Sequence, residues 1–399
     1  MNFFNFNASW RLRCLVLVVL VSNVAAAALL PPYETRNSDV FPAIFHFGDS
    51  NSDTGSTSAV FFPVKPPNGM TFFGKPSGRF CDGRLSIDFI AERLQLPYLS
   101  PYMDGLEGKY KHGANFAVGG TTITPVDGDT YALGLTPISL NLQLLQFYHL
   151  KSRVTELHKQ DETSVFENRL PKPEDFSKAL YTFDIGQNDI ALLIALTSED
   201  RVFQSLHDLI DRFSPSIEQL HELGARRFVI LNIGPMGCLP MYVERYPADS
   251  KIFDDNGCIK SHNEVAKEYN RLLKARVSLL RTKLEGSSIE YVDMYSAKYG
   301  LITNAKRYGF VDPLKQCCED CMKGDEHYWT RTVAELIKEE VPTACENPSK
   351  YISWDGMHYS DAANHWIARH IFDGSAEDPL VKLSNITRQP CQMRKVSRV

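Results

Sequence analysis

The chain has 399 residues, with 43 Lys and Arg against 48 Asp and Glu and a formal net charge of −5. Hydrophobic residues make up 43% and aromatic residues 11%, which is ordinary for a globular protein and excludes a disordered or collagen-like chain. The mildly acidic balance, with basic residues scattered, argues against nucleic acid as a partner.

The first 28 residues have the pattern of a secretory signal peptide. Two arginines precede the apolar run Cys14–Val21, and the small residues Ala25–Ala28 follow it. An uncleaved membrane anchor is the alternative, but polar residues after the run leave it short of the roughly 20 apolar residues that span a bilayer. We therefore expect residues 1–28 to be removed as a signal peptide and residues 29–40 to form an N-terminal lead segment before the domain. The mature protein is expected to be extracellular (apoplastic) or vacuolar, without stable membrane insertion.

Short apolar segments alternate with segments of helical period along the rest of the chain. In chain order, strands are expected at 42–47, 114–118, 180–185, 228–233 and 289–294, and helices at 86–95, 139–159, 215–223, 263–284 and 361–372. Buried strands that alternate with helices predict an α/β fold with a mainly parallel, doubly wound sheet in a three-layer α/β/α arrangement. One domain is expected at 41–374, followed by a tail at 375–399.

The cysteines agree with a secreted chain. One of the nine lies in the predicted signal peptide, and the even number that remains suggests disulfides, with Cys238 and Cys258 as the first candidate pair. The alternative is a zinc site, although the spacing fits no common zinc pattern; it would use Cys317, Cys318, Cys321 and Cys345. Asn385 begins an Asn-x-Thr sequon and is the predicted glycosylation site.

Polar or glycine-rich segments follow three of the predicted strands, and another precedes the last predicted helix. Ligands of such sheets bind outside the carboxyl ends of the strands, so these segments are the candidates for chemistry. They are Gly48-Asp49-Ser50, Gly119-Gly120, Gly186-Gln187-Asn188-Asp189 and Asp355-Gly356-Met357-His358.

Each segment also has a plain structural interpretation. A serine or aspartate can cap a helix, and paired glycines or an asparagine can form a turn. His46 is expected to be a packed strand residue, and Asp49 and Asp53 are expected to be structural. A metal site is a further alternative for the last segment, with Asp355, His358, Asp361 and His365 as ligands. No G-x-S-x-G sequence occurs, which disfavours an ordinary α/β-hydrolase.

Taken together, the four blocks FGDSxxDxG, Gly-Gly, GxND and DxxH resemble the SGNH hydrolases, and within them the plant-type GDSL esterase/lipase family. The resemblance covers residues 41–374 and is nearest to the early-nodulin-like and acetylesterase-like branch. It implies an SGNH, flavodoxin-like fold. The segment after Cys318 departs from it, because Glu319 and Asp320 stand where many relatives continue with glycines.

The residue types in these blocks suggest a catalytic mechanism. Ser50 needs a base to act as a nucleophile, His358 is the candidate base, and Asp355 orients it. The family pattern implies that the amides of Ser50 and Gly120, with Gly119 as the shifted option, and the side chain of Asn188 form an oxyanion hole. No cofactor or metal is required, and the expected partner is a small-molecule acyl ester.

Three functions fit these residues. The first is a secreted carboxylic-ester hydrolase that works through an acyl-Ser50 intermediate. The second is an acyltransferase that passes the same acyl group to an alcohol. The third is a non-catalytic defence or binding glycoprotein on a hydrolase fold. The acyl and alcohol parts of the substrate and the oligomeric state are left open.

Overall fold

The computed structural model describes residues 41–106, 108–126, 134–160, 166, 168–247, 250–322 and 341–373. The fold below is that of the compact unit that begins at Phe41. The predicted signal peptide and lead (1–40), the tail (375–399) and the sequon at Asn385 lie outside the described residues, so these remain predictions.

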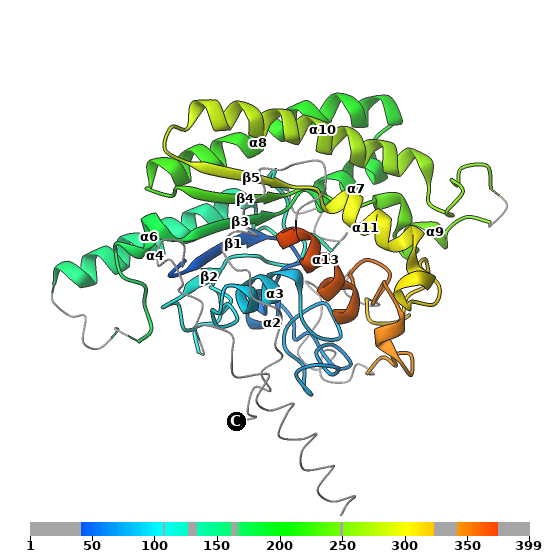
Figure 1. Cartoon of the computed structure of the whole chain (residues 1–399), viewed down its shortest axis with the longest axis horizontal. Coiled ribbons are helices and arrows are strands. Elements are labelled where there is room, and N and C mark those ends of the chain that lie inside the picture. The colour runs from blue at the N-terminus through cyan, green and yellow to red at the C-terminus, as the bar shows by residue number, and fades with distance from the viewer. Residues whose placement is uncertain are drawn as a thin grey trace, which may run out of the picture. The chain divides into compact units, whose positions relative to one another are not determined.

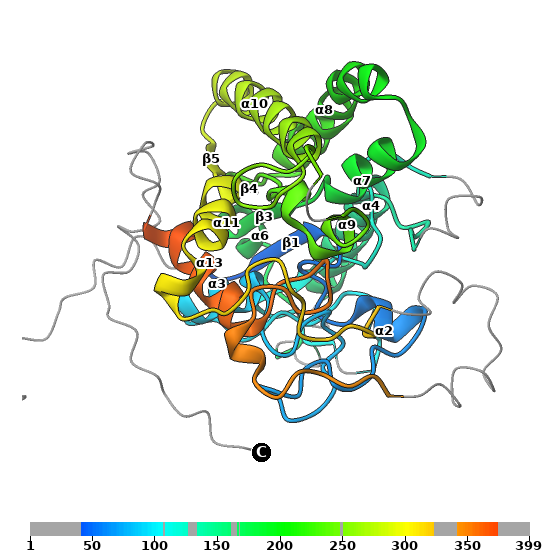
Figure 2. The ribbon, with the colours of Figure 1, turned by 90° about the vertical axis from the view of Figure 1, so that its right-hand side faces the viewer.

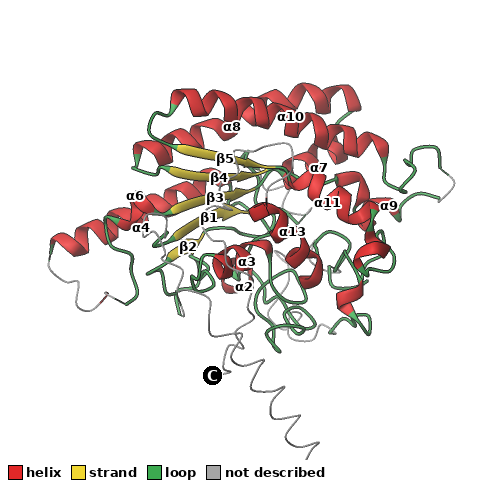
Figure 3. Ribbon diagram, viewed as in Figure 1, coloured by secondary structure: helices red, strands yellow, loops and turns green. Residues whose placement is uncertain are grey.

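Five parallel strands form the sheet, in the order β2-β1-β3-β4-β5 (Figures 1 and 3). This order is the flavodoxin-like form of the doubly wound sheet, and it confirms the predicted α/β class. The strands are β1 (Ile44–Gly48), β2 (Gly113–Asn115), β3 (Leu180–Asp184), β4 (Arg227–Leu231) and β5 (Ser288–Val292).

Helices cover both faces of the sheet, as Figure 2 shows. The helices are α2 (Ser56–Val60), α3 (Ser86–Arg93), α4 (Leu140–Lys159), α6 (Asp175–Lys178), α7 (Gln187–Leu196), α8 (Glu199–Glu222), α9 (Pro240–Val243), α10 (Lys260–Lys283), α11 (Met294–Thr303) and α13 (Asp361–Asp373), with 3₁₀ turns η2 (Met236–Cys238), η3 (Ala305–Tyr308) and η5 (Pro348–Lys350).

The side chains of the strands alternate between two cores. Phe45 and Phe47 of β1 point to one face, where they pack with α4, α8 and α10. Ile44 points to the other face and joins α3, α11 and α13. This alternation follows from the period of two of a strand, and it gives the three layers that the sequence predicted.

Most predicted elements differ from the structure by a few residues at their ends, and three of these differences have a visible local reason. The helix expected from residue 215 begins at Glu199, and Pro215 lies inside it. The last strand ends at Val292, not at 294, because the Asp293 side chain accepts a hydrogen bond from the Ser296 amide and caps α11. The second strand ends at Asn115, whose side-chain oxygen accepts from the Ala117 amide at 2.9 Å and turns the chain.

Disulfides join six cysteines of the described residues. Cys238 pairs with Cys258, which confirms the predicted bond. Cys81 is free and buried, and Cys391 lies outside the described residues. The four cysteines of the alternative zinc site are instead joined in the pairs Cys317–Cys345 and Cys318–Cys321.

Candidate active site

Ser50 lies in the turn that follows β1. Gly48, the last residue of the strand, is tightly enclosed, because a Cβ at this position would lie 2.8 Å from the carbonyl oxygen of Asp184. The side chain of Gln143 on α4 accepts from the Gly48 amide at 3.1 Å and donates to the Gly48 carbonyl at 2.8 Å. The position of the Ser50 turn is therefore fixed by both the neighbouring strand and the helix.

The structure brings Ser50, His358 and Asp355 into one chain of hydrogen bonds. The imidazole Nε2 of His358 lies 2.8 Å from the Ser50 Oγ. Its Nδ1 lies 2.7 Å from the Asp355 Oδ2. All three residues are buried, with Ser50 the most exposed at 7%. This is the arrangement in which an imidazole can take the proton of a serine hydroxyl while a carboxylate fixes its tautomer.

Asp355 is held in its ionised form by its neighbours. Burial alone would raise its pKa, but the charge of His358 and three hydrogen bonds outweigh burial and hold the pKa of Asp355 below its ordinary value. The bonds come from the imidazole and from the backbone amides of His358, at 2.7 Å, and Met357, at 3.0 Å. The carboxylate is thus charged at neutral pH and can stabilise an imidazolium.

The two glycines of the second block have different surroundings. The Gly119 amide already donates to the Asp53 Oδ2, at 3.1 Å, and the Thr57 Oγ1, at 2.9 Å. Gly120 has a φ of +76°, which only glycine adopts without strain. Within the described part of the chain, the Gly120 amide donates to no protein acceptor. Of the two, Gly120 is therefore the glycine whose N–H is not already used by a protein acceptor among the described residues.

Asn188 and Asp189 both bind the loop that follows these glycines. The Asn188 Nδ2 donates to the Thr121 carbonyl at 2.8 Å and retains a second N–H. The carboxylate of Asp189 accepts from the amides of Ile123, at 2.9 Å, and Thr124, at 3.1 Å. No role for Asp189 is predicted from the sequence, although its place beside Asn188 in the same block is a signal for one.

Other candidate residues take structural partners. Asp53 accepts from the amides of Gly55 and Ser56 at the start of α2. The Asp49 Oδ1 accepts from the Asn51 amide at 2.9 Å, while burial and the nearby charge of Asp184 raise the pKa of Asp49 to about 7.

The alternative metal site is not assembled. Asp361 forms an ion pair with Arg84, with its Oδ1 3.0 Å from the Arg84 Nε. His365 stacks on Phe89, with ring centroids 5.1 Å apart. Across the described ranges, no group of three or more His, Cys, Asp or Glu side chains is placed to hold a metal ion.

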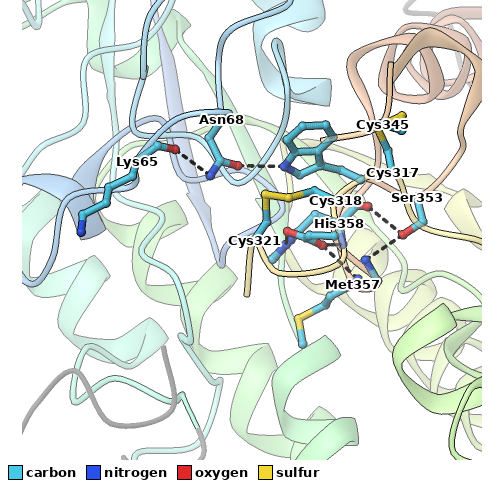
Figure 4. The surroundings of a disulfide bond; sticks show 12 residues. Lys65, Asn68, Cys317, Cys318, Cys321, Cys345, Ser353, Met357 and His358 are labelled. Carbon is cyan, nitrogen blue, oxygen red and sulfur yellow. Dashed lines mark hydrogen bonds and ion pairs between the residues drawn. A yellow bond between two sulfur atoms is a disulfide. The ribbon is translucent and has the colours of Figure 1, made fainter. Parts of the chain in front are cut away.

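The loop that carries Asp355 and His358 is bound to residues 317–321, the cysteine-rich segment (Figure 4). The Cys318 amide donates to the Trp354 carbonyl at 2.7 Å, and the Cys317 amide donates to the same oxygen at 3.0 Å. The Trp354 indole donates to the Asn68 Oδ1 at 2.8 Å. The loop is thus fixed from two sides, by the disulfide-bonded segment and by the loop of Asn68.

Comparison with known proteins shows which family the chain is similar to. The family model of the GDSL-like lipases/acylhydrolases matches residues 44–371. A GDSL esterase/lipase of Arabidopsis thaliana is 42% identical over 94% of each chain. The GDSL esterase/lipase ENOD8 of Medicago truncatula is 40% identical over 93% of this chain and 96% of its own.

Another Arabidopsis thaliana relative has a different name. This protein, Alpha-L-fucosidase 3, is 41% identical over 89% of this chain and 97% of its own.

None of the helices among the described residues is both long and apolar enough to cross a membrane.

Proposed function

The chain belongs to the GDSL-like lipase/acylhydrolase family, and on this premise we propose that it is a secreted serine esterase that cleaves carboxylic esters through an acyl-Ser50 intermediate. The observation that carries the proposal is the continuous hydrogen-bond chain from the Ser50 hydroxyl through His358 to Asp355. Because all three side chains are buried, their mutual attraction is stronger than it would be in water.

The reaction has two halves. In the first, the Ser50 oxygen attacks the ester carbonyl carbon while its proton passes to the Nε2 of His358. The imidazolium then gives that proton to the leaving alkoxide as the carbon–oxygen bond breaks, and an acyl-serine remains. In the second half, water attacks the acyl group, His358 again takes and returns the proton, and the acid leaves. Asp355 stays ionised throughout.

We assign the oxyanion hole to three donors: the amides of Ser50 and Gly120 and the free N–H of the Asn188 side chain. The bond from Asn188 to the Thr121 carbonyl supports this assignment, because it orients the amide and ties it to the loop of Gly120. Loss of one such donor typically costs about 3–4 kcal/mol of transition-state stabilisation.

The name of the fucosidase relative raises a second chemistry. Glycosidases generally place two carboxylates on opposite sides of the bond that they cleave. Asp355 accepts from the imidazole and from two backbone amides, which suits an acid that orients a histidine. This observation favours ester chemistry for the present chain.

The acyltransferase alternative uses the same acyl-serine and differs only in the acceptor of the acyl group, which is an alcohol in place of water.

We also propose that the protein enters the secretory pathway and carries an N-glycan at Asn385. Both proposals rest on sequence patterns outside the described residues.

The direct test is labelling with a fluorophosphonate probe, followed by assays of ester hydrolysis. Wild-type protein should be labelled and active, and Ser50→Ala should be neither. Labelling that survives in Ser50→Ala would overturn the proposal. Product analysis with an ester and a competing alcohol separates hydrolysis from acyl transfer, and an aryl fucoside in the same assay tests the glycosidase chemistry.

A further inference from the structure

We propose that Phe80 is a positioning residue for ester hydrolysis, whose ring holds the imidazole of His358 toward Ser50 and stabilises the imidazolium that forms during the reaction. The inference rests on the proposed role of His358 as the base. Phe80 lies in the loop between α2 and α3 and belongs to none of the four blocks that the sequence analysis singled out.

The ring of Phe80 lies against the imidazole. The two ring centroids are 5.2 Å apart and the planes are inclined by 27°. Phe80 is 6% exposed and His358 is 1% exposed, so little water separates or surrounds them. The ring also reaches the second block, because a Cβ on Gly119 would lie 3.0 Å from the Phe80 Cε2. Phe80 thus contacts the base and lies beside the glycines.

The fold holds Phe80 in this place from both ends of its loop. On one side, the Asn68 side chain accepts from the Trp354 indole at 2.8 Å (Figure 4). On the other side, the Asp82 Oδ1 accepts from the Asp361 amide at 2.7 Å. These two bonds connect the segment around Phe80 to residues on both sides of His358. The segments that carry Phe80 and His358 are therefore hydrogen-bonded to each other on both sides of the stacked contact.

The contact should matter more when the imidazole is charged. A cation within about 6 Å of an aromatic centroid is attracted by the negative face of the ring, whereas a neutral ring gains mainly packing. Two carboxyl groups that face His358 are Asp355, bonded at its Nδ1, and Asp49 in the turn of Ser50. Replacement of Phe80 leaves both residues in the chain, so a change in the variant is assigned to the loss of the ring.

The chain provides a matched control. Phe89 stacks on His365 with ring centroids 5.1 Å apart and planes inclined by 29°, and Phe89 is also 6% exposed. This pair has the ring geometry of the Phe80–His358 pair but lies between α3 and α13, and its histidine, unlike His358, is exposed. Phe89→Leu therefore reports what the loss of a stacked, buried ring does to the protein in general.

The experiment measures kcat/KM for ester hydrolysis against pH in wild type, Phe80→Leu and Phe89→Leu. In Phe80→Leu the acid limb should move to lower pH, because the imidazolium is less stable, and the maximal rate should fall about fivefold. Phe89→Leu should keep the acid limb of the wild type. An unshifted acid limb in an active, folded Phe80→Leu overturns the inference.

A second variant separates electrostatics from packing and also covers the case that Phe80→Leu does not fold. Pentafluorophenylalanine at position 80 keeps the ring shape but removes the negative face, and it should move the acid limb in the same direction. His358→Gln tests the premise: if this variant keeps its activity, the proposed function fails. If it is inactive while the fluorinated ring changes nothing, only the role of Phe80 fails.

Discussion

At the scale of single residues, the candidate site depends on the hydrogen bonds that hold each side chain in one orientation, as Asp355 shows. Asp355 uses one oxygen for two backbone amides and the other for the imidazole of His358. The bonds to the backbone place the carboxylate, and the bond to the ring fixes the tautomer that leaves Nε2 free to accept from Ser50. Orientation and charge are thus supplied by the same side chain.

Asp355→Asn should separate these two roles. The Asn oxygen can still accept from the backbone amides, whereas its NH₂ group would face Nδ1 and favour the wrong tautomer. We expect kcat to fall about 10³- to 10⁴-fold with little change in thermal unfolding. Steady-state kinetics and calorimetry on the same preparation check this, and a variant with near-normal kcat would show that another group orients His358.

His46 illustrates a buried histidine without a catalytic task. Its Nδ1 lies 2.6 Å from the Thr182 Oγ1, and its Nε2 has no partner in the described part of the chain. Burial lowers the pKa of His46 to about 3. A folded-state pKa below the unfolded value means that the unfolded chain binds the proton more tightly, so stability is full above pH ~6.5 and is lost as the pH falls.

The predicted consequence is a pH-dependent difference between wild type and His46→Gln. Between pH 8 and pH 5, wild type should lose about 2 kcal/mol of unfolding free energy relative to the variant, because only wild type must bury a group that prefers to be protonated. Urea titrations at the two pH values give this difference. A constant difference would contradict the buried, neutral state of His46.

At the scale of elements, the nucleophile turn depends on α4 as much as on β1. Gln143 is completely buried and pairs with both backbone groups of Gly48, two residues before Ser50. It also donates to the Thr121 Oγ1 at 3.2 Å, which connects the turn to the loop of Gly120. One side chain therefore holds two parts of the candidate site in register.

Gln143→Leu should reduce stability by about 1–3 kcal/mol, because it leaves the polar groups of Gly48 buried without partners. Activity should fall as well, since the turn is no longer fixed. Gln146→Leu on the same helix is the matched control: the Gln146 Oε1 is buried without a partner among the described residues, so its removal should be neutral or stabilising. Equal losses in the two variants would show that the Gly48 bonds are unimportant.

The sequence predicted the five strands to within a few residues, because short apolar runs that end in glycine or asparagine are distinctive. It did not predict α7, whose Ala191–Leu196 stretch is apolar throughout and has no polar face to give a helical period. It placed the start of α8 at Pro215, because proline is common at the start of a helix, whereas α8 begins at Glu199. The contact of Phe80 with His358 depends on packing between distant segments, which no local pattern reveals.

At the scale of the whole molecule, two disulfides cross-link the cysteine-rich segment, whose backbone is hydrogen-bonded to the loop of His358. The amides of Cys317 and Cys318 both donate to the Trp354 carbonyl. The bond Cys317–Cys345 joins residues 28 positions apart, whereas Cys318–Cys321 joins residues 3 positions apart. The longer connection constrains the unfolded chain more.

Removal of each bond by paired Cys→Ala changes should therefore have unequal effects. Loss of Cys317–Cys345 should cost about 3–4 kcal/mol and loss of Cys318–Cys321 about 1.5 kcal/mol, from the loop lengths alone. Denaturant unfolding of the two double variants measures both. The reverse order would mean that contacts of the segment with Trp354, rather than chain entropy, set the contribution of the disulfides.

The central claim is that Ser50 carries the acyl group during turnover. The most direct test uses a chromogenic ester as substrate and stops the reaction with acid within the first turnover. Peptide mass spectrometry then locates the acyl group. The account predicts an adduct of acyl mass on the peptide of Ser50, absent in Ser50→Ala and rare in His358→Gln. Turnover at the wild-type rate in Ser50→Ala, or an acyl adduct on another residue, would contradict it.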